Sequence, residues 1–228
     1  MTDIWPAGTR AIIEGPQGER TITAEDLRTL RRDLERFELE YQFALREMET
    51  KISILQDEFT HVHDYNPIEH VSSRVKTFDS IVAKAQRKGV ALDLESLREE
   101  ILDIAGLRLT CSFTRDVYRL YTLLTDQPDV TVVETKDYIR SPKPNGYRSL
   151  HAIITTPVHL SSGPIEVPVE IQFRTIAMDF WASLEHKIHY KYQGEAPQEI
   201  LDELCEAATT AAALDVQMEK LHNKVHGE

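Results

Sequence analysis

Residues 137–151 limit the folds open to this chain more than any other stretch. A β-branched run at residues 130–133 precedes them and an apolar run at residues 153–154 follows, which predicts a strand on either side. Between the strands, Pro142, Pro144 and Gly146 exclude regular structure and predict a rigid, kinked loop. The polar and aromatic residues of this loop are Arg140, Lys143, Asn145, Tyr147, Arg148 and His151. A rigid basic loop with an aromatic face suits an anion attached to a flat ring, such as a nucleotide; the alternative is a solvated surface loop.

The chain as a whole is acidic and long enough for an ample core. It has 228 residues, 41% of them hydrophobic, and a formal net charge of -12, so we expect one or two domains. This charge argues against general binding to nucleic acid and makes local basic clusters informative. Cys111 and Cys205 lie far apart in apolar or helical contexts, which predicts reduced thiols. Without a signal-peptide pattern or an apolar run of about 18 residues, we expect a soluble, cytoplasmic protein with no membrane contact.

Two long helices are predicted near the ends of the chain. Thr23 is a candidate N-cap, and apolar residues recur at steps of three and four from Leu27 to Phe59. Pro197 opens a second helix, which has its own apolar stripe. We expect each stripe to pack on the other helix or on a second copy of the chain. Residues 1–22 are rich in turn residues and are predicted to be an irregular segment.

A basic cluster is predicted where a strand over residues 67–76 runs into a helix that starts at Thr77 or Phe78. Arg74 and Lys76 share one face of the strand because side chains alternate with a period of two. The helix adds Ser80, Lys84, Arg87 and Lys88. Like charges that converge in this way repel unless an anion lies between them. The pattern therefore favours a polyphosphate site over a solvated basic helix face.

Two carboxylates are predicted on neighbouring strands of a mixed sheet. Asp103 enters a mostly apolar strand that also carries Arg108, and these charges are either structural ion-pair members or functional groups. In the strand over residues 167–174, Glu170 and Gln172 face the same side. Two such carboxylates suit Mg²⁺, which prefers oxygen ligands and bridges nucleotide phosphates. Neither glycine-rich nucleotide fingerprint, G-x-x-x-x-G-K-[ST] or G-x-G-x-x-G, is present.

Five motifs then occur in order at sensible spacing. They are Arg74-Val-Lys76, Asp103-Ile-Ala-Gly-Leu-Arg108, the loop from Asp137-Tyr-Ile to Ser-Leu-His151, Val169-Glu-Ile-Gln-Phe-Arg-Thr175 and Trp181-Ala-Ser-Leu-Glu-His186. Together they resemble the synthetase domain of RelA/SpoT proteins, and the length resembles a stand-alone small alarmone synthetase. The resemblance implies a nucleotidyltransferase-like α+β fold with a mixed, mostly antiparallel sheet flanked by helices. The synthetase domain would span residues 23–196, and residues 197–228 would form an oligomerisation helix of a homotetramer.

The resemblance also implies a reaction: ATP donates a pyrophosphate to the 3′-hydroxyl of GDP or GTP, and AMP leaves. Asp103 would hold Mg²⁺, with Glu170 as a second ligand or as the base for the 3′-hydroxyl. The implied ATP-binding residues are Arg74, Lys76, Ser80, Lys84, Arg87, Lys88 and Arg108, the last against adenine. The implied guanine-nucleotide residues are Lys143, Asn145, Tyr147, His151, Gln172 and Glu185, with Tyr147 stacked on the base. Lys136 stands where some relatives have an arginine that stacks on the second face of adenine.

Another class of protein fits part of the pattern. A catalytically idle nucleotide sensor, or a module that binds single-stranded RNA through the Arg and Tyr residues of the loop, would use the same clusters. Asp103 and Glu170 favour the enzyme, because a pure binding module has no use for two carboxylates beside a phosphate site. The sequence leaves open the preference among GMP, GDP and GTP.

Overall fold

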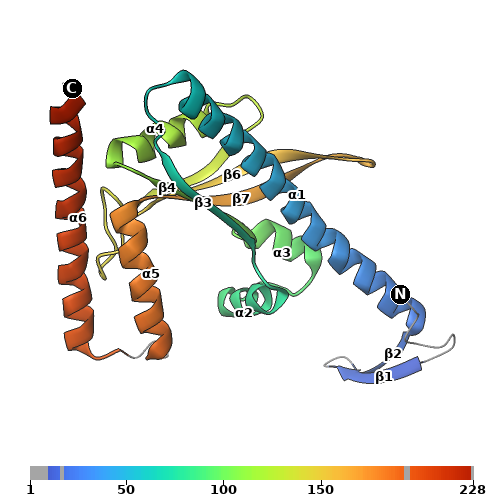
Figure 1. Ribbon diagram of the computed structural model, residues 1–228. Helices are drawn as coiled ribbons and strands as arrows, with labels where there is room; N and C mark the ends of the chain where they lie inside the picture. Colours follow the sequence, from blue (N-terminus) through green and yellow to red (C-terminus); the bar gives the residue numbers. More distant parts are fainter. Residues whose placement is uncertain (1–9, 16–17, 193–195, 227–228) are drawn as a thin grey trace. The chain divides into compact units, whose positions relative to one another are not determined.

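The computed structural model describes residues 10–15, 18–192 and 196–226 (Figure 1). The chain divides into two compact units, Met1–Glu40 and Tyr41–Glu228. The helix α1 (Ala24–Val62) crosses the boundary between them. No described helix is both long enough and apolar enough to span a lipid bilayer.

The first unit contains a β-hairpin and the start of α1. Strand β1 (Arg10–Gly15) pairs antiparallel with β2 (Gly18–Thr23). We predicted irregular structure for residues 1–22, whereas the described part of that segment forms these strands, because β-branched residues flank the turn residues on both sides. Thr23 caps α1 as predicted: Asp26 N donates to Thr23 Oγ1 at 3.2 Å, and Thr23 N donates to Asp26 Oδ2 at 2.8 Å.

The second unit is built on a five-stranded sheet with the order β3-β4-β7-β6-β5. Its strands are β3 (Ile68–Val75), β4 (Ala105–Cys111), β5 (Thr131–Asp137), β6 (Leu150–Leu160) and β7 (Gly163–Thr175). Strands β4 and β7 are parallel, and the other neighbouring pairs are antiparallel. The predicted α+β fold with a mixed, mostly antiparallel sheet is confirmed.

The two faces of this sheet differ because side chains alternate along each strand. Leu107 and Leu109 on β4 and Ile171 and Phe173 on β7 are buried on one face. Helix α4 (Thr114–Thr125) packs against β4 and β7, and its Leu120 is fully buried. The residues between these apolar positions are only partly buried. The opposite face is therefore available for polar chemistry.

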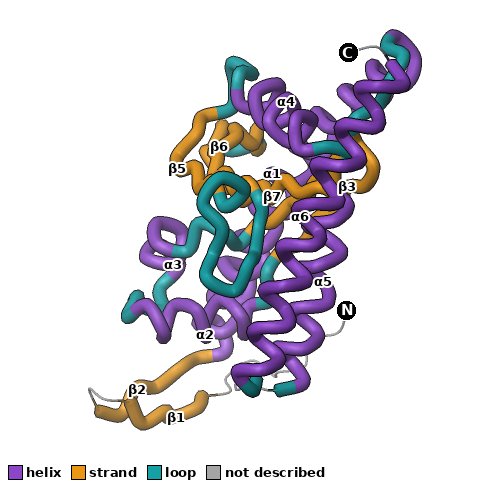
Figure 2. The backbone as a smooth tube through the Cα atoms, turned by 90° about the vertical axis from the view of Figure 1, so that its left-hand side faces the viewer, coloured by secondary structure: helices purple, strands orange, loops and turns teal. Residues whose placement is uncertain are grey.

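In the described part of the chain, four more helices flank the sheet. They are α2 (Phe78–Lys88), α3 (Leu94–Glu100), α5 (Ile176–Lys191) and α6 (Gln198–His226). Helices α5 and α6 lie side by side (Figure 1). The loop between β5 and β6 stands in front of the sheet, between α2 and α3 on one side and α5 and α6 on the other (Figure 2).

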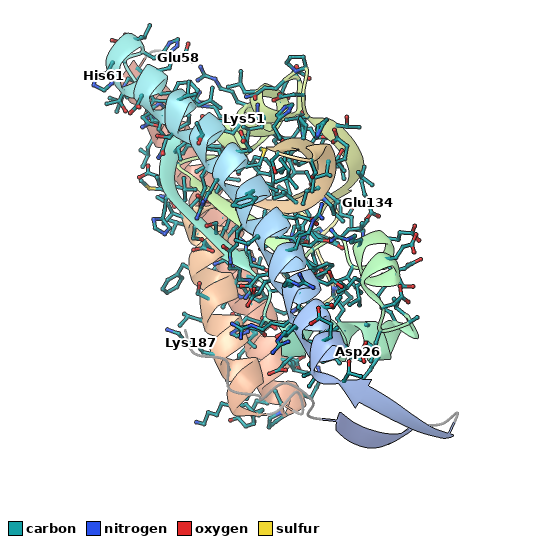
Figure 3. All side chains as sticks on the ribbon, turned by 90° about the vertical axis from the view of Figure 1, so that its right-hand side faces the viewer. Asp26, Lys51, Glu58, His61, Glu134 and Lys187 are labelled. Carbon is teal, nitrogen blue, oxygen red and sulfur yellow. The ribbon has the colours of Figure 1, made fainter. Side chains whose placement is uncertain are left out.

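The second half of α1 belongs to the second unit and buries an apolar stripe. Tyr41, Met48 and Ile52 on this stripe are at most 1% exposed. Lys51 donates to the Asp129 carboxylate at 2.7 Å beyond the end of α4 and is labelled in Figure 3. The second half of α1 therefore packs on the same side of the sheet as α4, and the polar face stays uncovered by it.

Candidate active site

A pocket of ≈ 270 Å³ opens on the polar face of the sheet. The predicted site residues that line it are Arg74, Lys76, Asp103, Arg108, Glu170 and Gln172. They come from β3, β4, β7 and the segments at the strand ends. The structure therefore brings together groups that are separated by almost a hundred positions in the sequence.

Gly106 lines this pocket and leaves space in it, because glycine has no side chain. In the sheet register, Arg74 on β3 pairs with Gly106 on β4, and Gly106 pairs with Glu170 on β7. A glycine between them leaves an empty place in the row of side chains that joins Arg74 to Glu170. A Cβ at this position would meet only ordinary contacts with Arg74, at 3.8 and 3.9 Å. Space for a ligand, not a backbone constraint, explains what the glycine does here.

Asp103 is the electrostatic centre of the pocket. Its Oδ2 accepts hydrogen bonds from Lys76 Nζ at 2.7 Å and from Lys84 Nζ at 2.6 Å. Burial would raise the pKa of this carboxyl, but the two lysines hold the pKa below its ordinary value. Its Oδ1 is buried and has no hydrogen-bond partner among the described residues. An ionised carboxylate with one unused oxygen fits a metal ligand.

A second ion-pair network lies at the end of β7. Asp179 on α5 accepts from Arg174 Nη1 at 2.9 Å and pairs with Arg108 Nη1 at 3.2 Å. Burial and the neighbouring Arg174 lower the pKa of Arg108 below its ordinary value, while Asp179 opposes this shift. Two arginines that share one carboxylate leave a local surplus of positive charge beside the pocket.

The loop between β5 and β6 gathers aromatic rings and cations around Tyr147. Lys143 Nζ lies 4.7 Å from the ring centroid of Tyr138 and 4.9 Å from that of Tyr147. Asn145 Nδ2 donates to Glu185 Oε1 on α5 at 3.3 Å. Because Lys143 is exposed, its ammonium can move away from the Tyr147 ring when a planar ligand group binds there. Tyr138 and Tyr147 give the loop an aromatic surface, and the stacking of a base on Tyr147 stays a prediction.

Glu170 joins the loop to the pocket. Its Oε1 is 3.1 Å from His151 Nδ1, and its Oε2 accepts from Gln172 Nε2 at 2.9 Å. Burial would raise the pKa of Glu170, but the hydrogen bonds from His151 and Gln172 hold it below the ordinary value of a glutamate. Glu170 is thus an ionised carboxylate between two clusters of different chemistry.

Helix α6 packs against one side of the loop. Gly146 has a φ of 87°, and a Cβ there would lie 2.5 Å from Ala208 Cβ. Cys205 Sγ donates to the Pro144 carbonyl at 3.3 Å. Trp181 packs with Ala208 and Tyr147 in one apolar cluster. The path of the loop therefore depends on the close approach of α6, as the neighbouring traces in Figure 2 illustrate.

Some predicted residues lie away from the pocket lining. Ser80 Oγ is 2.8 Å from Thr77 Oγ1 at the start of α2, and Lys88 Nζ donates to the Glu100 carbonyl at 2.7 Å. Arg87 is exposed in the last turn of α2. The roles of these three residues in binding ATP stay predictions. Lys136 on β5 is paired with Glu134 at 2.9 Å.

Sequence reasoning missed three residues of the site. Arg174 continues the period of two of Glu170 and Gln172 along β7, but no role was assigned to it from the sequence. Asp179 carried no signal, because its partners are set by the angle between β7 and α5. Tyr138 precedes the prolines of the loop, and its ring reaches Lys143 only in the folded chain. The period-two pattern of β7 was the one signal that pointed to Arg174.

The fold and the site together define a class: an α+β protein whose sheet face pairs a carboxylate-and-lysine pocket with an aromatic, cationic loop. The chain matches the family described as "Region found in RelA / SpoT proteins" over residues 73–195. It is 50% identical over 194 residues to GTP pyrophosphokinase YwaC of Bacillus subtilis (strain 168), an alignment that covers 85% of this chain and 92% of that protein.

Solved structures agree with the sequence comparison. Small alarmone synthetase 2 from Bacillus subtilis matches with a TM-score of 0.77 and 49% identity, over 84% of this chain and 99% of that one. Small alarmone synthetase 1 from the same organism, bound to its product pppGpp, matches with a TM-score of 0.80 and 38% identity, over 86% of this chain and 99% of that one. The chain belongs to the RelA/SpoT family.

Proposed function

We propose that this chain is a (p)ppGpp synthetase, which transfers pyrophosphate from ATP to the 3′-hydroxyl of GDP or GTP and releases AMP. The observation that carries the proposal is that Glu170 lies between a pocket suited to polyphosphate and a loop suited to a purine base. Relatives of similar length support it, since one is a GTP pyrophosphokinase and another holds pppGpp as its product. ATP and GTP are abundant in the cytoplasm, where we place the reaction.

The chemistry requires two nucleotides held in a fixed alignment. The 3′-oxygen of the guanine nucleotide bonds to the β-phosphorus of ATP, and the bond from that phosphorus to the α,β-bridging oxygen breaks. AMP is the leaving group, and the 3′-hydroxyl proton passes to Glu170. An ionised, hydrogen-bonded carboxylate at this point is suited to the role of base. Fixed cations stabilise the charge that develops on the transferred phosphoryl oxygens.

On the ATP side, the lysines that neutralise Asp103 are suited to bind phosphate. Lys76 and Lys84 share a single carboxylate oxygen, so either can exchange this contact for a phosphate oxygen without leaving a charge unpaired. Arg74 lines the same pocket. We assign these three residues to the phosphates of ATP, together with Ser80, Arg87 and Lys88 along α2, and Arg108 to its adenine.

The proposed cofactor is Mg²⁺, held by Asp103, with Glu170 as a second ligand where it does not act as the base. The buried, unpartnered Asp103 Oδ1 fits such a ligand. Among the described residues, no cluster of three or more His, Cys, Asp or Glu side chains could hold a metal by itself, which agrees with an ion whose remaining ligands are phosphate oxygens and water. When bound, the metal would neutralise phosphate charge.

On the guanine side, we assign the base to the Tyr147 ring. Stacking of a base on an aromatic ring contributes roughly 1–3 kcal/mol. Asn145 and Glu185, which already bond to each other, offer polar groups for the edge of the base. Lys143, His151 and Gln172 complete the set of proposed guanine-nucleotide residues.

The direct test is to incubate the purified chain with ATP, GDP and Mg²⁺ and separate the nucleotides by anion-exchange chromatography. We expect equal amounts of AMP and ppGpp, and no AMP when GDP or Mg²⁺ is left out. Nucleotide binding without AMP formation would contradict the proposal and favour an idle sensor. Binding of single-stranded RNA, measured in parallel, would point to an additional RNA-binding activity on the same loop.

We also propose that the active protein is a homotetramer. A mainly apolar groove of ≈ 1140 Å³ runs between α5 and α6, and Phe180 on its rim is 66% exposed. Apolar surface of this kind favours burial against another copy. Light scattering should give four times the 26.1 kDa of one chain, and Phe180→Asp should dissociate the assembly. A monomer at micromolar concentration would contradict this assignment.

A further inference from the structure

The carboxylate of Glu170 is held by two hydrogen bonds, one to each oxygen. An ionised carboxylate only accepts hydrogen bonds. The contacts at 3.1 Å to His151 Nδ1 and at 2.9 Å to Gln172 Nε2 therefore require both nitrogens to donate. In the neutral imidazole, a donating Nδ1 leaves Nε2 of His151 as an acceptor.

Both His151 and Gln172 are linked in turn to Arg174, His151 through Tyr147 and Gln172 directly. A guanidinium only donates hydrogen bonds, and Arg174 Nη2 donates to Tyr147 Oη at 2.8 Å and to Gln172 Oε1 at 3.0 Å. With His151 Nε2 as an acceptor 2.8 Å away, the Tyr147 hydroxyl donates its proton to that nitrogen, while its oxygen accepts from Arg174. Each of these contacts then joins one donor to one acceptor, with no conflict of direction.

Two arms thus run from one guanidinium to one carboxylate. The first arm passes through Tyr147 and His151, and the second passes through Gln172. Arg174 itself is 5% exposed, and its Nη1 donates to Asp179 at 2.9 Å. Because Arg174 is buried and ion-paired, its guanidinium is held in one position, and it can only donate. The directions of the hydrogen bonds that start from it are therefore fixed.

We propose that Arg174 is a positioning residue for Glu170, which it orients through these two arms, and that the Tyr147 hydroxyl is a link in the first arm. The inference rests on the proposed function, in which Glu170 accepts the 3′-hydroxyl proton. It gives Tyr147 a second task besides stacking. The ring sets the place of the guanine base, and the hydroxyl sets the orientation of the carboxylate that meets the ribose of the same nucleotide.

Tyr147→Phe separates these two tasks, because it keeps the ring and removes the hydroxyl. We expect kcat to fall by about tenfold, the effect typical of losing a partner that orients a site residue. The KM for GDP should stay within about twofold. In an Arg174→Gln background the same substitution should change kcat by less than about twofold, because the arm has already lost its origin. If Arg174→Gln does not fold, Arg174→Lys, which keeps the charge, replaces it as the background for this comparison.

Tyr121→Phe is the matched control. The Tyr121 hydroxyl bonds to Thr135 Oγ1 at 3.0 Å, outside the two arms, so its loss should leave kcat unchanged. An unchanged kcat in Tyr147→Phe would overturn the proposal. So would a rise in the KM for GDP at constant kcat, or additive effects of Tyr147→Phe and Arg174→Gln.

A second readout does not need activity. ¹⁵N NMR of the His151 imidazole reports which ring nitrogen carries the proton, and we expect Nδ1 in the wild type and a mixture of tautomers in Tyr147→Phe. A wild type with the proton on Nε2 would contradict the direction of the arm. If the wild type forms no AMP, the proposed function fails, and the tautomer measurement still decides whether Arg174 orients this network.

Discussion

The ATP-side pocket and the loop around Tyr147 meet at Glu170 but are built on different principles. In the pocket, opposite charges pair with one another, as Lys76 and Lys84 do with Asp103. In the loop, a cation lies against aromatic rings, as Lys143 does against Tyr138 and Tyr147. In each region, contacts to the ligand can replace the internal contacts. Phosphate and metal can replace the partners in the ion pairs of the pocket, and a stacked base can replace the cation against the rings of the loop.

The two regions also differ in what holds them in place. The pocket is lined by strands and strand ends, whose positions follow from the sheet register. The loop is irregular and depends on α6, through the approach of Gly146 to Ala208 and the contact of Cys205 with Pro144. We therefore expect substitutions in the pocket to alter chemistry with little effect on folding, and substitutions behind the loop to alter stability and guanine binding together.

The largest effect should come from two carboxylates: Asp103, which lines the pocket, and Glu170, where the pocket and the loop meet. Asp103→Asn or Glu170→Gln should lower kcat by about three orders of magnitude, because each removes a metal ligand or the base. The Tm, measured by thermal denaturation, should show that both variants fold. Turnover near that of the wild type in either variant would contradict the assignment of that residue.

The next effect separates the two nucleotides. Tyr147→Ala removes the stacking surface and should raise the KM for GDP by about tenfold or more, with the KM for ATP changed only a few-fold. Lys84→Ala should do the reverse, because its ammonium bonds to Asp103, which lines the proposed phosphate pocket. Steady-state kinetics with each nucleotide varied in turn provides the measurement. Equal weakening of both nucleotides in both variants would mean that the two regions form one shared site.

A smaller effect tests the support of the loop by α6. Gly146→Ala should lower the Tm by about 5 °C or more and raise the KM for GDP, because the added Cβ collides with Ala208 and the positive φ is strained. The matched control is Gly89→Ala, which has a similar φ of 71° but meets no atom within 4 Å. It should lower the Tm by about 2–4 °C through strain alone and leave the KM for GDP unchanged. A normal KM for GDP in Gly146→Ala would show that α6 does not position the loop.

The smallest effect concerns Asp215 on α6, which is buried and accepts from Thr175 Oγ1 at 2.7 Å. Burial and the Glu219 carboxylate raise the pKa of Asp215 above its ordinary value, although Thr175 opposes the shift. As the pH rises through and above the ordinary value of about 3.9, the unfolded chain loses this proton before the native chain does, so the wild type loses stability.

Asp215→Asn keeps an acceptor for Thr175 and removes the buried charge. Its Tm should exceed that of the wild type by about 2 °C at neutral pH, and the difference should vanish at acidic pH, where Asp215 is neutral in both states. Asp202→Asn, at an exposed position of the same helix, should show no such pH dependence. A gain that persists at low pH would assign the effect to packing and not to charge.

Much of this site could be predicted from local sequence because its residues follow strand and loop rules. The period of two along β7 placed Glu170 and Gln172 on the open face, and the apolar residues between them identified the buried face. The prolines and Gly146 marked the loop, and Thr77 marked the start of α2. In the first unit the same rules were misapplied, since turn residues between two β-branched runs indicate a hairpin as readily as an irregular segment.

The sequence by itself determined the elements of the second unit, the polar face of its sheet and the residue types that meet there, because these follow from backbone sterics and side-chain alternation. Only the tertiary structure decided which groups are paired. It placed both lysines on one oxygen of Asp103, set Arg174 at the origin of two hydrogen-bond arms and brought α6 against Gly146. These contacts join residues that are distant in the chain or lie on different elements, so they depend on the angles at which whole elements pack, and no local periodicity encodes those angles.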